Sequence, residues 1–225
     1  MHPTTNTLSS LAIFSLIAGS ANAGTLVLNP FADGADSSSG ISATITYTHK
    51  IDVNKDADTA VINTVSFDNT GAYTLTGPGN NFPNYNSPAD NGSGLDVLMN
   101  NFKYGGQPAT LTLTGLAAGE TYKLRLYVGG FGGNLQDFSF DDTVTPTTYD
   151  DVPRNAGTDA VPGSIDYTYT LGAGDTDLEM VVGPQVTTDS FHFYGFSNEV
   201  VPVPEPSSTA LLGLGGLALI LRRRK

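Results

Sequence analysis

The sequence predicts an all-β protein whose central body is an antiparallel two-sheet β-sandwich of jelly-roll-like type. Three observations lead to this fold class. Apolar and polar residues alternate with a period of two through most of residues 24–200, turn-forming residues separate the alternating segments, and no window carries a helical apolar stripe of useful length. A parallel sheet with crossover helices is therefore excluded.

The expected strands are short and follow this alternation along the chain. In residues 41–48, Ile, Ala, Ile and Tyr alternate with Ser and Thr, which is typical of a half-buried strand with a threonine-rich outer face. Residues 122–128 and 165–171 repeat the pattern with Tyr and Leu. The predicted strands span residues 25–29, 41–48, 61–67, 95–102, 110–114, 122–128, 136–140, 165–171, 178–182 and 190–196.

Residues 111–128 are the most informative part of the body. Two alternating segments flank a Gly-Leu-Ala-Ala-Gly turn at residues 115–119, which predicts a hairpin or a corner between two strands. This segment resembles the L-x-G-L-x-x-G-x-x-Y segment of many exported β-sandwich modules, including galactose-binding-like jelly rolls. A long loop rich in Asn, Pro and Gly is expected at residues 77–94, as surface decoration or as part of a binding face.

Composition and charge limit the chemistry of the chain. Its 225 residues suffice for one domain with extensions, and the absence of cysteine excludes a disulfide framework, thiolate metal sites and a cysteine nucleophile. The formal net charge is −12, and residues 24–205 hold six basic against 22 acidic residues, a difference of −16. Such a body repels polyphosphate, so we expect no nucleic-acid partner.

The first 23 residues are typical of a secretory signal peptide. An apolar run at residues 11–18 is followed by Ala21 and Ala23, which form an A-x-A cleavage pattern ahead of Gly24. We therefore expect residues 1–23 to be removed, the mature chain to begin at Gly24, and the β-sandwich domain to occupy residues 24–201.

The last segment, residues 202–225, has three parts in a fixed order. A proline-rich stretch is followed by an uncharged apolar run and then by a basic cluster at residues 222–225. As a helix, residues 207–221 cover about 22 Å, which spans a bilayer when the flanking arginines snorkel and the bilayer thins. We expect a short transmembrane helix with its basic end in the cytoplasm and the acidic body outside.

This order resembles the PEP-CTERM sorting signal of exported bacterial proteins. The residues that carry the resemblance are Val203, Pro204, Glu205, Pro206, Arg222, Arg223 and Arg224. It implies a Gram-negative-type envelope, an exosortase-like membrane protease as partner and transient membrane insertion. It also implies delivery to the cell surface or to the extracellular matrix.

Enzymatic chemistry has little support in the body, and we expect no enzyme. The chain has no G-x-S-x-G motif, and only His49 and His192 remain as candidate bases after signal removal. The alternative is a secreted carbohydrate-active hydrolase, which needs two facing carboxylates. Its candidates are Asp137, Asp141, Asp142, Asp150 and Asp151.

A second alternative is a calcium-dependent binding module. We expect no cofactor other than calcium. The candidate oxygen ligands stand at positions 1, 3, 5 and 7 of an EF-hand-like loop, namely Asp52, Asn54, Asp56 and Asp58. Position 6 is Ala57 where glycine is needed, and position 12 is Asn63 where a bidentate carboxylate belongs. A solvated loop between two strands is therefore the favoured interpretation.

Carbohydrate binding is the leading hypothesis for the body, with extracellular polysaccharide as the partner. Tyr104, Phe131 and Tyr149 are expected near glycine-rich turns, where their rings are candidates to stack on sugar faces. The alternative is that these rings belong to the core. The sequence thus predicts a non-enzymatic cell-surface or matrix protein that binds exopolysaccharide.

Overall fold

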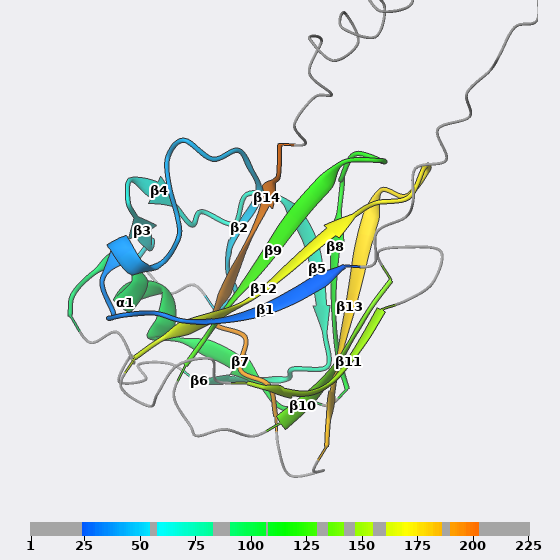
Figure 1. Ribbon diagram of the computed structural model, residues 1–225. Coiled ribbons are helices and arrows are strands. Elements are labelled where there is room, and N and C mark those ends of the chain that lie inside the picture. The colour runs from blue at the N-terminus through cyan, green and yellow to red at the C-terminus, as the bar shows by residue number, and fades with distance from the viewer. Residues whose placement is uncertain are drawn as a thin grey trace, which may run out of the picture.

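Two five-stranded antiparallel sheets pack face to face in the computed structural model (Figure 1). The structure describes residues 24–54, 58–82, 91–106, 108–129, 135–141, 147–154, 161–185 and 190–202. The predicted all-β antiparallel sandwich is thereby confirmed.

The first sheet contains both ends of the body. Its strands, in spatial order, are β1 (Thr25–Pro30), β12 (Gly163–Thr170), β9 (Thr121–Val128), β14 (Gly195–Val200) and β2 (Tyr47–Asp52). Every neighbouring pair is antiparallel.

The second sheet is also antiparallel throughout. Its strands, in spatial order, are β11 (Thr147–Pro153), β10 (Leu135–Phe140), β13 (Asp177–Pro184), β8 (Ala109–Thr114) and β5 (Ala72–Thr76). The smaller elements are the pair β3 (Val61–Ile62) and β4 (Val65–Ser66), the pair β6 (Asn80–Phe82) and β7 (Phe102–Tyr104), the 3₁₀ turn η1 (Asp36–Ser38) and the helix α1 (Gly94–Met99).

The chain crosses between the two sheets repeatedly after β8. It passes from the second sheet to β9, returns to β10 and β11, crosses to β12, back to β13 and finally to β14. Such crossings distinguish a jelly-roll-like sandwich from a meander. The inward-facing residues of both sheets form the main core, where Phe140 of β10 stacks on Tyr167 of β12 with ring centroids 3.7 Å apart.

Several predicted strands differ from those observed. Residues 41–46 form a loop and the strand begins at Tyr47, while residues 61–67 divide into β3 and β4 around Asn63 and Thr64, which both have positive φ. The last strand begins at Gly195 rather than at residue 190. β5, β6, β7 and β11 were not predicted. β6 and β7 have three residues each and β5 has five, which gives alternation little length to show, while β11 is rich in Thr and Asp.

The strand predicted at residues 95–102 is wrong, because this segment begins as the helix α1. Ser93 caps the helix by accepting a hydrogen bond from the backbone N–H of Asp96 at 3.1 Å. Leu95, Leu98 and Met99 are buried at spacings of three and four residues, which match one helical face. They contribute to a second apolar cluster, which also includes Tyr127 of β9.

The predicted signal peptide, with Ala21 and Ala23, and the predicted membrane helix of residues 207–221 lie outside the described residues. Within the described part of the chain, no helix is both long and apolar enough to cross a membrane.

Candidate functional site

A cluster of rings lies where β6 and β7 meet the segment that leads into β14. We call Phe82, Phe102, Tyr104, His192 and Tyr194 the β6–β7 aromatic cluster. Phe82 stacks almost parallel on Phe102, with centroids 5.1 Å apart, and Phe102 stacks on His192 at 4.4 Å. Tyr104 meets both Phe82 and His192 edge-on, at 6.2 Å each.

Strand pairing assembles this cluster from three distant parts of the chain. The β6–β7 register places Phe82 opposite Phe102. A bridge between Lys103 and Phe193, with backbone hydrogen bonds in both directions, brings the segment around His192 against β7. The hydroxyl of Tyr194 donates to the carbonyl of Gly129 at 2.8 Å, which fixes the buried end of the cluster.

The cluster has a buried side and an exposed side. Phe102 and Tyr194 are buried, whereas the Phe82 side chain is 39% exposed and Tyr104 and His192 are partly exposed. Exposed aromatic faces beside polar atoms are the usual platform for flat, amphipathic ligands. The cluster therefore offers a stacking surface on a rigid support.

The electrostatics of the cluster keep its imidazole neutral. Burial, with the Arg154 charge beside it, lowers the pKa of His192 to about 3. Arg154 is held by its own donation to the carbonyl of Ser190 at 2.9 Å. The neutral imidazole of His192 supplies a ring face, and the guanidinium of Arg154 supplies hydrogen-bond donors. The site therefore carries one positive charge here rather than two.

The structure separates the three aromatic residues that the sequence predicted as ligand contacts. Tyr104 belongs to the β6–β7 aromatic cluster, while Phe131 lies outside the described residues. Tyr149 packs edge-on against Phe140 and Tyr167 and donates its hydroxyl to the carbonyl of Gly24. Tyr149 thus supports the main core and the start of the body.

Sequence reasoning missed Phe82 and did not assign His192 to this site. Phe82 is the only aromatic residue besides Tyr85 in the long loop of residues 77–94. The available signal was an aromatic residue among Asn, Pro and Gly. Such a residue has few apolar neighbours in the sequence to pack against, which makes it a candidate for a binding surface.

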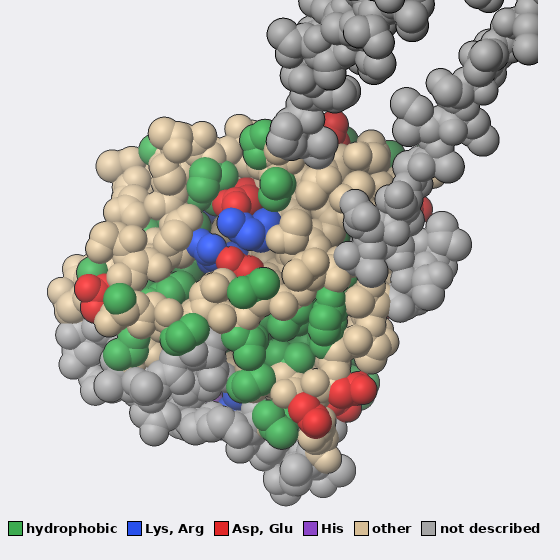
Figure 2. Space-filling view, in the orientation of Figure 1, with side chains coloured by type: hydrophobic (Ala, Val, Ile, Leu, Met, Phe, Trp, Pro, Cys, Tyr) green, Lys and Arg blue, Asp and Glu red, His purple; other side chains and the backbone are tan. Residues whose placement is uncertain are grey.

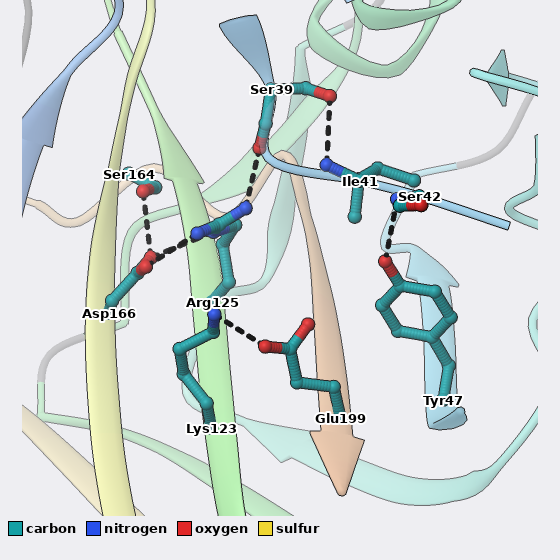
Figure 3. A network of polar contacts seen from close by, with 9 residues as sticks. All are labelled: Ser39, Ile41, Ser42, Tyr47, Lys123, Arg125, Ser164, Asp166 and Glu199. Carbon is teal, nitrogen blue, oxygen red and sulfur yellow. Dashed lines mark hydrogen bonds and ion pairs between the residues drawn. The ribbon is translucent and has the colours of Figure 1, made fainter. Parts of the chain in front are cut away.

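A polar network covers the outer face of the first sheet, where Figure 2 shows acidic and basic side chains gathered over β9, β12 and β14. Arg125 donates two hydrogen bonds to the Asp166 carboxylate, of 2.9 and 2.6 Å, and a third to the carbonyl of Ser39 at 2.6 Å (Figure 3). Burial works to lower the pKa of Arg125, but the hydrogen bonds to Asp166 and the charges of Tyr127, Asp166 and Glu199 together outweigh burial and raise that pKa above its usual value. The network fastens the loop of residues 31–46 to the sheet.

A groove of about 410 Å³ adjoins this network at the place where the described chain ends. Lys123 and Glu199, which form an ion pair, contribute to its lining (Figure 3). The complete lining consists of Thr44, Ile45, Thr46, Lys123, Thr168, Glu199, Val200, Val201 and Pro202.

The residues considered for hydrolysis have mainly structural contacts. His49 is buried and bridges the sheets, with its Nε2 3.0 Å from the carbonyl oxygen of Ala72 on β5.

The carboxylates considered for hydrolysis lie in different surroundings. Asp137 and Asp151 are brought together, since the Gln185 amide donates to both carboxylates. Burial, followed by the charges of Glu179 and Asp177, raises the pKa of Asp141. Asp150 is exposed on β11, and Asp142 lies outside the described residues.

The candidate calcium loop is only partly described, because Asp56 lies outside the described residues. Asp52 is buried at the end of β2, and Asp58 is exposed. Asn63, at position 12, donates to the carbonyls of Asp36 and Ile41 and so helps to hold the loop of residues 31–46. Among the described residues, no group of three or more His, Cys, Asp or Glu is arranged to hold a metal ion.

Solved structures share the fold of the body. The plant receptor-like kinase ANX2 matches with a TM-score of 0.50 at 13% identity, over 70% of this chain and 49% of that chain. The ANXUR1 extracellular domain from Arabidopsis thaliana has a TM-score of 0.42 at 15% identity, over 71% of this chain and 51% of that chain. The chain thus spans about half the length of these structures, and the likeness concerns the fold.

Comparison with curated proteins gives no match to the sequence. Comparison with protein families matches residues 202–225 to the PEP-CTERM protein-sorting motif. The match includes the sequence-predicted residues Val203 to Pro206 and the basic cluster, all of which lie outside the described residues. This motif implies processing by an exosortase, a membrane protein. Residues 202–225 are therefore a PEP-CTERM sorting motif, which marks this all-β protein for export to the cell envelope or outer surface.

Proposed function

We propose that the exported body is a non-enzymatic carbohydrate-binding module that holds extracellular polysaccharide through the β6–β7 aromatic cluster. The observation that carries the proposal is Phe82, a residue that is 39% exposed, stacks on buried Phe102 and is flanked by Tyr104. A sugar ring has an apolar face of C–H groups, which packs on such a ring and leaves its hydroxyls for nearby polar groups.

Polar partners for sugar hydroxyls stand beside the rings. The Arg154 guanidinium lies next to His192, and Asn80 faces Tyr104 across the β6–β7 pair. Stacking combined with a few polar contacts is the common composition of a small-ligand site. The acidic balance of residues 24–205 favours neutral polysaccharides over strongly anionic ones.

Binding is tested with the mature secreted protein and with the exopolysaccharide of a strain that exports it, by affinity electrophoresis and by titration calorimetry. Phe82→Ala removes the exposed ring, and we expect affinity to fall about three- to tenfold, the value of one aromatic contact. Phe82→Tyr keeps the stacking face and is expected to bind within about twofold of the wild type.

The matched control is Val27→Ala, which removes an exposed apolar side chain from β1, where Val27 is 48% exposed. This variant is expected to bind as the wild type does. Equal affinity of Phe82→Ala and the wild type would refute the site. Release of reducing ends from the polysaccharide by the wild-type protein would instead refute the non-enzymatic assignment.

A further inference from the structure

We propose that the groove beside Pro202 is a docking surface for the membrane protease that processes the sorting motif. The inference depends on the PEP-CTERM motif and not on sugar binding. It means that the folded body, and not the tail alone, contributes to recognition by that protease.

The folded body continues to the very start of the motif. Val200 donates its backbone N–H to the carbonyl of Thr46 at 3.0 Å, and Val201 donates to the carbonyl of Thr121 at 2.8 Å. Pro202 lines the groove, and the family match begins at the same residue. The backbone is therefore fixed within one residue of the motif.

The reach of the chain brings the protease close to the groove. From Pro202 to Pro206 the chain spans at most about 14 Å, whatever its conformation, since each residue extends at most ~3.6 Å. A protease that encloses several residues of an extended substrate is wider than this distance. An enzyme that binds Val203 to Pro206 is therefore within reach of the groove.

The membrane also limits the distance between the body and the protease. The predicted membrane helix begins at residue 207, so the body is held against the bilayer in which an exosortase resides. Thr168 and Lys123 are cross-strand partners near the exit of the chain, and so are Lys123 and Glu199. These residues consequently face the enzyme while the tail is inserted.

The lining of the groove offers both polar and apolar contacts to a polypeptide. One side comes from residues 44–46, which belong to a loop held in place because the Tyr47 hydroxyl accepts from the Ser42 N–H and Arg125 donates to the Ser39 carbonyl (Figure 3). The Lys123–Glu199 pair provides both a donor and an acceptor for backbone or polar groups. A contact here raises the effective concentration of the enzyme at the adjacent motif.

The test is the rate at which full-length chains lose the tail in a strain that has an exosortase, measured by pulse-chase with an antiserum against the body. Thr168→Trp fills the groove. Thr112→Trp is the matched control, because Thr112 is also a half-buried threonine on the outer face of a strand second from a sheet edge. We expect the half-time of processing to lengthen about fivefold or more with Thr168→Trp and to stay within about twofold with Thr112→Trp.

Protease resistance of the variants in the same extracts reports their folding. If Thr168→Trp does not fold, a second variant carries the test: six Gly and Ser residues inserted between Pro202 and Val203 move the motif about 13 Å away on average. Docking predicts slower processing of this variant, whereas mere crowding by the body predicts equal or faster processing.

Equal half-times for the two tryptophan variants would overturn the docking surface, as would normal or faster processing of the chain with the spacer. A wild-type chain that keeps its whole tail would overturn docking together with tail processing, and it would leave the sugar-binding measurement unaffected.

Discussion

His49 and His192 lie in surroundings that favour their neutral forms. Burial lowers the pKa of His49, although its contact with the Ala72 carbonyl works in the opposite direction. Burial and the Arg154 charge lower the pKa of His192 to about 3. In the unfolded chain both residues return to a pKa near 6.5.

This difference predicts a loss of stability in mild acid. Below about pH 6.5 the unfolded chain binds protons that the folded chain does not, so the free energy of unfolding falls as pH decreases. Each histidine contributes a slope of up to about 1.4 kcal/mol per pH unit. Urea unfolding at pH 7, 6 and 5 measures it. The double variant His49→Gln, His192→Gln is expected to flatten the slope in this window, and an unchanged slope would contradict the assignment.

At the scale of elements, the loop of residues 31–46 depends on one close approach to the first sheet. Gly40 has φ +73°, and a Cβ atom at this position would overlap Nη1 of Arg125. The Arg125–Asp166 pair is buried, so displacing the guanidinium removes the charge partner of a buried carboxylate. Glycine at position 40 therefore avoids two costs: the strain of a side chain at positive φ and the displacement of the Arg125 guanidinium.

Gly40→Ala separates these two effects when it is compared with Gly119→Ala. Gly119 has a similar φ of +78°, and no atom lies within 4 Å of the place that an alanine Cβ would take, so its substitution costs only the backbone strain, about 1–2 kcal/mol. We expect Gly40→Ala to cost about 3 kcal/mol or more beyond that value. Chemical denaturation measures both variants. Equal losses would show that the Arg125 contact adds nothing.

At the scale of the whole molecule, both ends of the body lie at the same end of the strands of the first sheet. Thr25 lies opposite Thr168, Thr168 opposite Lys123, and Lys123 opposite Glu199, so the four residues form one row across β1, β12, β9 and β14. Three strand spacings separate the two ends of the row, about 14 Å. The fold can therefore be complete while both targeting segments remain attached to one membrane.

This arrangement predicts a stable circular permutant. Pro202 joined to Gly24 by about eight Gly and Ser residues, with new ends opened in the exposed turn at Gly174, preserves every strand pair. We expect its Tm to stay within about 5 °C of the unpermuted body, as read by circular dichroism. A permutant that fails to fold, beside an unpermuted body carrying the same linker as a folded control, would contradict the placement of the ends.

Much of the fold was predictable because neighbouring residues carry the information. Alternation identified β9, β12 and β13 to within two residues at each end, since a half-buried strand imposes a period of two. The same rule failed at Leu95, Leu98 and Met99, where six residues are too few to distinguish a helix from a strand without the Ser93 cap. It also missed β11, whose strand position depends on pairing with β10 rather than on its own sequence.

The sorting motif follows from the primary sequence, because it consists of three consecutive segments in a fixed order: a proline-rich stretch, an apolar run and a basic cluster. The aromatic cluster and the groove do not. Phe82, Phe102 and His192 meet only through pairing between distant strands. The pairing of β11 with β10 likewise places Tyr149 against the core. Period and composition are local properties of a chain, whereas the exposure of a ring depends on which remote strands cover it.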